Sequence, residues 1–146
     1  MEAVLRSSGL DVCALRPGAI YGPGLVPGGR QPNREWSLFE HVHRGEHQLK
    51  LPERGNQLFH PVAVGRVGRA VARAVELAQA GFWPCNVVDP SYSTYAGRAA
   101  QIGELLGWRW DPVPVGFEET DHPRQAAHPI IASDLRLREA LGVHEP

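Results

Sequence analysis

Cysteine, lysine and long apolar runs are scarce in this sequence of 146 residues. Two cysteines are too few for a disulfide framework or a four-cysteine zinc module. Neither sign of charge is in excess, with 15 basic and 16 acidic residues, which argues against a general nucleic-acid binder. No apolar run approaches the roughly 20 residues that cross a bilayer, and residues 1–8 lack a signal-peptide pattern. These absences predict a soluble, cytoplasmic protein with no nucleic-acid or membrane partner.

The composition that remains is typical of a globular protein. Apolar residues make up 42% of the chain and charged residues 21%. A chain of this length can bury most of its unfolded surface in one core, so we expect a single domain over residues 1–146.

Two short apolar runs predict buried strands. One spans Leu10–Ile20, and the other spans Phe82–Val88 and is closed by Asp89. Runs without polar alternation are typical of parallel sheets that are covered on both faces. Cys13 and Cys85 lie in these runs, where a thiol acts as a small apolar side chain.

Apolar residues at helical spacing predict helices around these strands. The clearest helix spans Pro61–Ala80, and we expect its valines to face the core and its charged residues to face solvent. The expected inward residues are Val64, Val67, Val71, Val75 and Ala78, and the expected outward ones are Arg66, Arg69, Arg73 and Glu76. Ser93 is the expected N-cap of a helix that runs to Leu106. Helices alternating with short buried strands predict an α/β fold.

Four segments follow one another in an order that resembles a known family. They are EAVLRSSGLDVCALRPGAIYGPG, FHPVAVGRVGRAVARAVE, CNVVDPSYSTYAGRAAQIGELLG and SDLRLREALG. Together, over residues 2–142, they resemble the extended short-chain dehydrogenases/reductases, the NAD(P)-dependent epimerase/dehydratase superfamily. The resemblance implies a Rossmann-type fold and the cofactor NAD or NADP.

Two motifs of that family are not found. The sequence has no glycine-rich strand-to-helix turn for a dinucleotide and no Tyr-x-x-x-Lys pair. The chain therefore resembles the C-terminal part of a Rossmann-type doubly wound sheet with the small substrate-binding subdomain, lacking the N-terminal nucleotide-binding half. We expect no catalytic residue in it, no dehydrogenase activity from it alone, and further sequence upstream of Met1.

The resemblance also implies which residues line a site. Those implied to lie against the nicotinamide are Pro17, Gly18, Ala19 and Ile20. Tyr21 is expected to shape the substrate pocket, while Arg30 and Arg34 are expected to hold an anionic group of a small-molecule substrate. The histidines at positions 41, 43 and 47 are expected to be surface residues, so no metal is predicted.

The substrate class stays open between two branches of the family. Nucleotide-sugar enzymes carry polar residues where Ala19, Phe59 and Arg66 stand here. The 3-beta-hydroxysteroid dehydrogenase-like branch resembles Cys13–Gly22 slightly better, which implies a hydroxysteroid-like substrate. The expected protein partner is a complementing N-terminal half or a second copy. The alternative function is a stand-alone, non-catalytic binding or dimerisation domain.

Overall fold

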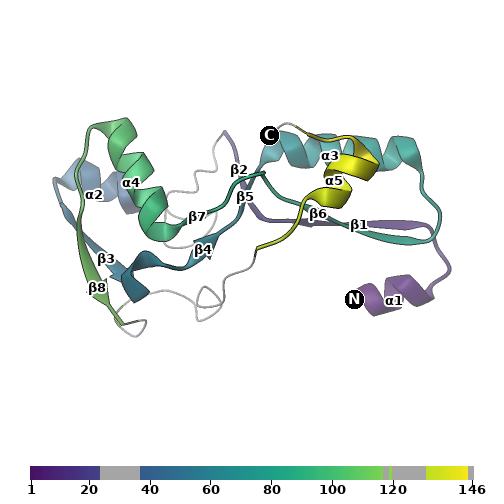
Figure 1. Cartoon of the computed structure of the whole chain (residues 1–146), viewed down its shortest axis with the longest axis horizontal. Coiled ribbons are helices and arrows are strands. Elements are labelled where there is room, and N and C mark those ends of the chain that lie inside the picture. The colour runs from purple at the N-terminus through teal and green to yellow at the C-terminus, as the bar shows by residue number, and fades with distance from the viewer. Residues whose placement is uncertain (24–36, 117–118, 120–130, 145–146) are drawn as a thin grey trace. The chain divides into compact units, whose positions relative to one another are not determined.

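The computed structural model describes residues 1–23, 37–116, 119 and 131–144, and these form two compact units (Figure 1). Unit 1 consists of Met1–Gly22, Pro61–Pro90 and Ala132–Pro146, and unit 2 consists of Pro23–His60 and Ser91–Ile131. The chain passes between the units more than once, so each unit is assembled from segments that are distant in sequence.

Unit 1 contains three helices and two short two-stranded parallel sheets among its described residues. Its elements are α1 (Glu2–Ser7), β1 (Val12–Pro17), β2 (Ala19–Tyr21), β5 (Pro61–Ala63), α3 (Val64–Leu77), β6 (Phe82–Val87) and α5 (Leu135–Leu141). Strand β1 pairs with β6, and β2 pairs with β5, both in parallel. The core comprises Val62, Ala70, Cys85, Val87, Leu137, Leu141 and Val143. The expected strand Phe82–Val88 is confirmed as β6.

Unit 2 has a second small core. Its elements are α2 (Ser37–Arg44), β3 (Gln48–Pro52), the 3-10 turn η1 (Glu53–Gly55), β4 (Leu58–Phe59), β7 (Ser93–Thr94), α4 (Tyr95–Leu106) and β8 (Asp111–Val115). Strands β3 and β8 are parallel, whereas β4 and β7 are antiparallel. The core comprises Leu38, Leu49, Leu51, Ala99 and Ile102. The expectation of an α/β fold with parallel strands is confirmed.

Two expected boundaries are wrong. The apolar run Leu10–Ile20 is not one strand, because the chain leaves β6 after Pro17 and pairs with β5 from Ala19 onward. The N-cap of α4 is Thr94 and not Ser93, since the Thr94 hydroxyl accepts the Gly97 N–H at 3.0 Å.

The expected helix Pro61–Ala80 is shorter, and its facing differs in part: Val67 packs on the core and Arg69, Arg73 and Glu76 are exposed as expected, but Arg66 and three of the valines are not placed as expected. Its first three residues form β5, and α3 begins at Val64. Arg66, expected to face solvent, is 0% exposed, whereas Val71 and Val75 are 48% and 74% exposed. The reason is Asp134, the N-cap residue of α5, whose carboxylate accepts a hydrogen bond from Arg66 Nη2 at 2.9 Å. An ion pair and two backbone carbonyls from the C-terminal stretch thus draw the arginine inward.

No helix among the described residues is long and apolar enough to span a membrane.

Candidate functional site

The carboxyl ends of β1 and β6 meet at one edge of unit 1. The last pair in their register is Pro17 with Val87, so the two strands end together. The Gly18 N–H donates to the Val87 carbonyl at 2.9 Å, which keeps the chain attached as it leaves β1. In α/β folds, ligands bind beyond the carboxyl ends of parallel strands. This edge is therefore the candidate site.

All the residues expected to line a cofactor lie at this edge. Pro17 ends β1, Gly18 forms the link, and Ala19, Ile20 and Tyr21 form β2. Pro17 is exposed and the other four are half-buried. Pro17 has no N–H and Gly18 has no Cβ, so a planar ring can approach the backbone closely at these two positions.

Asp89 is the polar centre of the edge. It follows β6 and is 5% exposed. Its Oδ2 accepts the Tyr21 hydroxyl at 2.9 Å, and its Oδ1 accepts the Ala63 N–H at 3.2 Å. Its own N–H donates to the Pro61 carbonyl at 2.9 Å. One carboxylate therefore fastens β2, β5 and the end of β6 to one another.

Sequence reasoning treated Asp89 only as the residue that closes a strand. Its position could have indicated a role at the site, because a carboxylate directly after a buried parallel strand lies where polar side chains gather. Its partners Tyr21 and Ala63 are too distant in sequence for any local pattern to reveal them.

Tyr21 is held by this carboxylate, with its hydroxyl directed at Asp89. The residue after it, Gly22, lies against α3, where an added Cβ would overlap the side chain of Val64. The end of β2 is therefore held in two ways: the Tyr21 hydroxyl donates to Asp89, and Gly22 packs closely against Val64. Arg30 and Arg34, expected to bind an anionic group, lie outside the described residues.

The described histidines do not form a metal site. His41 Nδ1 lies 2.6 Å from the Glu46 carboxylate. His47 stacks on Trp108 with ring centroids 4.1 Å apart. Within the described ranges, no three His, Cys, Asp or Glu side chains come together in a way that could hold a metal ion.

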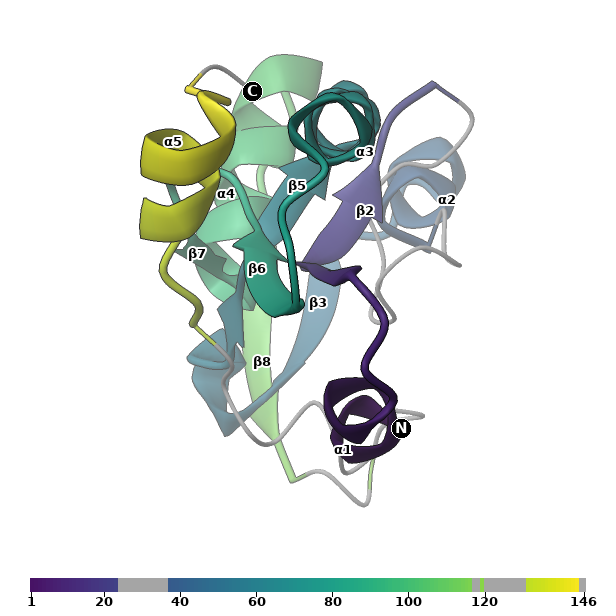
Figure 2. The same cartoon turned by 90° about the vertical axis from the view of Figure 1, so that its right-hand side faces the viewer.

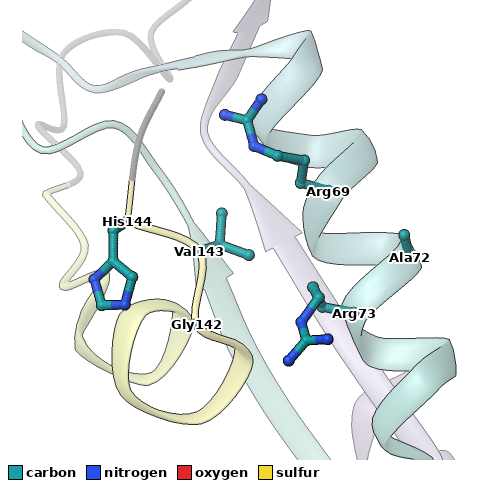
Figure 3. A pocket seen from close by; sticks show the side chains of 6 residues that line it. All are labelled: Arg69, Ala72, Arg73, Gly142, Val143 and His144. Atoms are coloured by element: carbon teal, nitrogen blue, oxygen red, sulfur yellow. The ribbon is translucent and has the colours of Figure 1, made fainter.

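A hollow of about 370 Å³ lies between α3 and the residues after α5 (Figure 3). Its polar lining residues are Arg69, Arg73 and His144. Arg73 Nε donates to the Leu141 carbonyl at 3.1 Å, and Arg73 Nη1 lies 2.5 Å from Glu76 Oε2. Arg73 is thus used to fasten the end of α5 to α3.

Cys85 is predicted to resist alkylation in the folded chain. Burial, with a smaller contribution from Cys13, raises the pKa of its thiol to about 11 from the ordinary 9.0. Because the thiolate is the reacting species, a rise of that size lowers the iodoacetamide rate at pH 8 about 100-fold. The rate is measured by mass spectrometry of the β6 peptide. Unfolding in urea should restore the rate of a free thiol, and rapid labelling of the folded chain would contradict the assignment.

Comparisons with known proteins bear on the fold of the chain. No protein-family model matches the chain, and no curated protein matches it in sequence. Solved structures do match. The dTDP-glucose 4,6-dehydratase of Streptomyces venezuelae, solved with NAD, matches 99% of this chain at a TM-score of 0.72 and 20% identity.

Two further solved structures have the same fold. The UDP-glucose 4-epimerase of Thermotoga maritima, solved with UDP-glucose, matches 99% of this chain at a TM-score of 0.72 and 23% identity. The RMD protein of Pseudomonas aeruginosa, solved with NADPH, matches 99% at a TM-score of 0.69 and 16% identity. This chain spans 42%, 44% and 47% of the three proteins, respectively.

The described residues thus form an α/β structure with parallel strands that matches part of larger solved structures. More particularly, the chain matches part of the fold of NAD-dependent epimerases and dehydratases, over less than half of their length.

Proposed function

We propose that this chain forms the substrate-side wall of an NAD(P)-dependent epimerase, dehydratase or reductase site of the extended short-chain type. In this proposal it corresponds to the C-terminal part of the doubly wound fold and acts with a nucleotide-binding polypeptide. The observation that carries the proposal is the strand-end edge. There Pro17 has no N–H, Gly18 has no side chain, and the Tyr21 hydroxyl donates a hydrogen bond to Asp89.

The residues at this edge fit only the nicotinamide end of a dinucleotide. When bound, NAD or NADP would exchange a hydride with a hydroxyl- or keto-bearing carbon of the substrate. The Gly18 N–H is already bonded to Val87, so it is not free to hold a phosphate. The sequence also lacks the glycine-rich turn that cradles a pyrophosphate. The nucleotide-binding partner would have to supply that turn and the proton-transfer group.

The substrate class remains a choice between a nucleotide sugar and a hydroxysteroid-like molecule. Matches to a dTDP-glucose dehydratase and a UDP-glucose epimerase favour the nucleotide sugar. The apolar Ala19 at the edge, where nucleotide-sugar enzymes have a polar residue, favours the hydroxysteroid-like molecule. UDP-glucose, dTDP-glucose and a 3-beta-hydroxysteroid are therefore the substrates to compare.

The test uses this chain with and without a nucleotide-binding partner. The probe is the part of the Thermotoga epimerase that this chain does not cover, expressed together with the full chain. We expect no NAD(P)H formation or dinucleotide binding by the chain alone, and binding by the pair. Gly18→Val should weaken binding by the pair at least about tenfold, because a branched side chain keeps the ring off the backbone.

The matched control is Ala80→Val, an exposed position before β6, at the opposite end of the strands. Equal effects of the two variants would count against the strand-end site. Turnover by the chain alone would refute the need for a partner.

A further inference from the structure

A hollow of about 400 Å³ lies in unit 2, where α4 faces β3 and the link to β8. Its helix side is formed by Ala96, Ala99 and Ala100, and its strand side by Leu49 and Leu51. Figure 2 shows β3 beside β8, with which it pairs in parallel. Small molecules usually bind in concave, mainly apolar hollows of about 300–1,000 Å³. We call this hollow the tryptophan hollow, because two tryptophans also line it.

Small residues on α4 leave room for the tryptophan hollow. Ala96, Ala99, Ala100 and Gly103 recur at helical spacing and so share one side of the helix. At Gly103 an added Cβ would lie 2.6 Å from the Trp108 carbonyl oxygen, so the chain after α4 approaches the helix closely there. Larger side chains on this side would fill the space between the helix and the strands.

The two tryptophans form a rigid wall. Trp108 and Trp110 pack edge to face with ring centroids 6.3 Å apart, and Trp110 Nε1 donates to the Ala99 carbonyl at 2.9 Å. His47 stacks on Trp108 with ring centroids 4.1 Å apart and planes inclined by 5°. The His47 ring is itself held, since its Nδ1 donates to the Arg109 carbonyl at 2.7 Å. A flat ligand that packs on these indoles therefore has little side-chain ordering to oppose its binding.

Polar groups of three kinds accompany the apolar walls. Glu104 and Arg109 line the hollow with exposed side chains, and neither side chain forms a hydrogen bond or ion pair with another described residue. Trp108 Nε1 is buried and, in the part of the chain that the structure describes, has no hydrogen-bond partner. Buried donors are nearly always paired, so an acceptor is expected beside this ring.

We propose that the tryptophan hollow binds a planar aromatic molecule that carries both an ammonium and a carboxylate group, as a free aromatic amino acid does. The ring packs among the alanines, leucines and indoles. The ammonium pairs with Glu104, and the carboxylate pairs with Arg109, whose guanidinium suits carboxylate geometry. None of the lining residues belongs to the strand-end edge, so this site does not depend on the proposed function.

The charges and the volume both favour this class of ligand. A ligand with one charge would be attracted by one of the two charged side chains and repelled by the other. A zwitterion is attracted by both. The volume of about 400 Å³ lies near the lower end of the range for ligand pockets, which favours a molecule of amino-acid size over a longer one.

The experiment compares four ligands that share one ring, using the full chain and titration calorimetry. They are L-tryptophan, tryptamine, indole-3-propionate and indole, which are zwitterionic, cationic, anionic and neutral. We expect L-tryptophan to bind most tightly. Tryptamine and indole-3-propionate should each bind about tenfold more weakly, because each lacks one charge-assisted hydrogen bond.

Three variants test the assignment of each part of the hollow. Glu104→Gln should weaken L-tryptophan and tryptamine but not indole-3-propionate, and Arg109→Gln should weaken L-tryptophan and indole-3-propionate but not tryptamine. Ala100→Leu should weaken L-tryptophan at least about tenfold, because the larger side chain occupies the space of the ring. The matched control is Gln101→Leu, the next residue of α4, which is exposed and does not line the hollow. Circular dichroism verifies that each variant is folded.

Three results would overturn the proposal. The first is that none of the four ligands binds the folded chain at millimolar concentration. The second is equal affinity for indole and L-tryptophan, which would show that the charges are not read. The third is unchanged binding by Ala100→Leu, or an equal loss in Gln101→Leu, which would place the ligand elsewhere. None of these measurements involves a dinucleotide, so their failure leaves the proposed function untouched.

Discussion

Asp134→Ala is expected to lower the free energy of unfolding of unit 1 by about 3–5 kcal/mol. The change leaves the Arg66 guanidinium, which is 0% exposed, with only two carbonyl oxygens at 3.4 and 3.5 Å. Leaving a buried cation without its counterion costs much more free energy than the intact ion pair contributes to stability. Urea unfolding by circular dichroism measures the loss. Amide exchange of peptides from α3 and β6 assigns it to unit 1.

Two controls separate the buried pair from ordinary surface charge. Arg138 also contacts Asp134, at 3.1 Å, but its side chain is 44% exposed, so Arg138→Ala should cost less than about 1 kcal/mol. Arg66→Met combined with Asp134→Leu removes both charges and should restore most of the loss. If Asp134→Ala is as mild as Arg138→Ala, the ion pair does not secure α5.

Gly55→Ala is expected to destabilise unit 2 by about 2–5 kcal/mol. Its φ of +73° is left-handed, which costs an L-residue about 1–2 kcal/mol. An added Cβ would also lie 2.9 Å from both the backbone nitrogen and the Cβ of Ala96, and such overpacking costs about 1–3 kcal/mol. Since the nitrogen belongs to the backbone of α4, no side-chain rotation relieves the overlap. Urea unfolding of the variant measures the change.

Gly107→Ala provides the comparison within the same unit. Gly107 has a φ of +63° but open space around its missing Cβ. Its replacement should therefore cost only the conformational part, about 1–2 kcal/mol. Equal losses at the two glycines would show that η1 does not press against α4.

Local patterns in the sequence predicted much of the fold. Strand β6 and helices α3 and α4 follow from short apolar runs and helical spacing, which act over a few residues. The glycines after α4 and α5 adopt the left-handed conformation expected of residues that end a helix. The stretch Pro17–Tyr21 was singled out by resemblance to a family and lies where β1 ends and β2 forms, and its role in binding stays a prediction.

The direction in which α3 faces was not predictable in the same way. Its valines form a good apolar stripe, so local reasoning turns them inward. The true inward side contains Arg66, because Asp134 lies 68 positions away and supplies the counter-charge. The contacts of Asp89 were missed for the same reason, since its partner Tyr21 is also 68 positions distant. Long-range pairing of polar groups overrides local hydrophobic spacing at both places.

The threading of the chain through unit 1 also sets the order in which the protein can mature on the ribosome. Strand β1 is translated before unit 2, yet the core that it joins includes Leu137 and Leu141, which follow unit 2. All of unit 2 is translated before those leucines leave the exit tunnel. Contacts of such long range form slowly and late. The nascent chain must therefore carry β1 and α3 without their complete core until α5 has been translated, and chaperones can act on them during that interval.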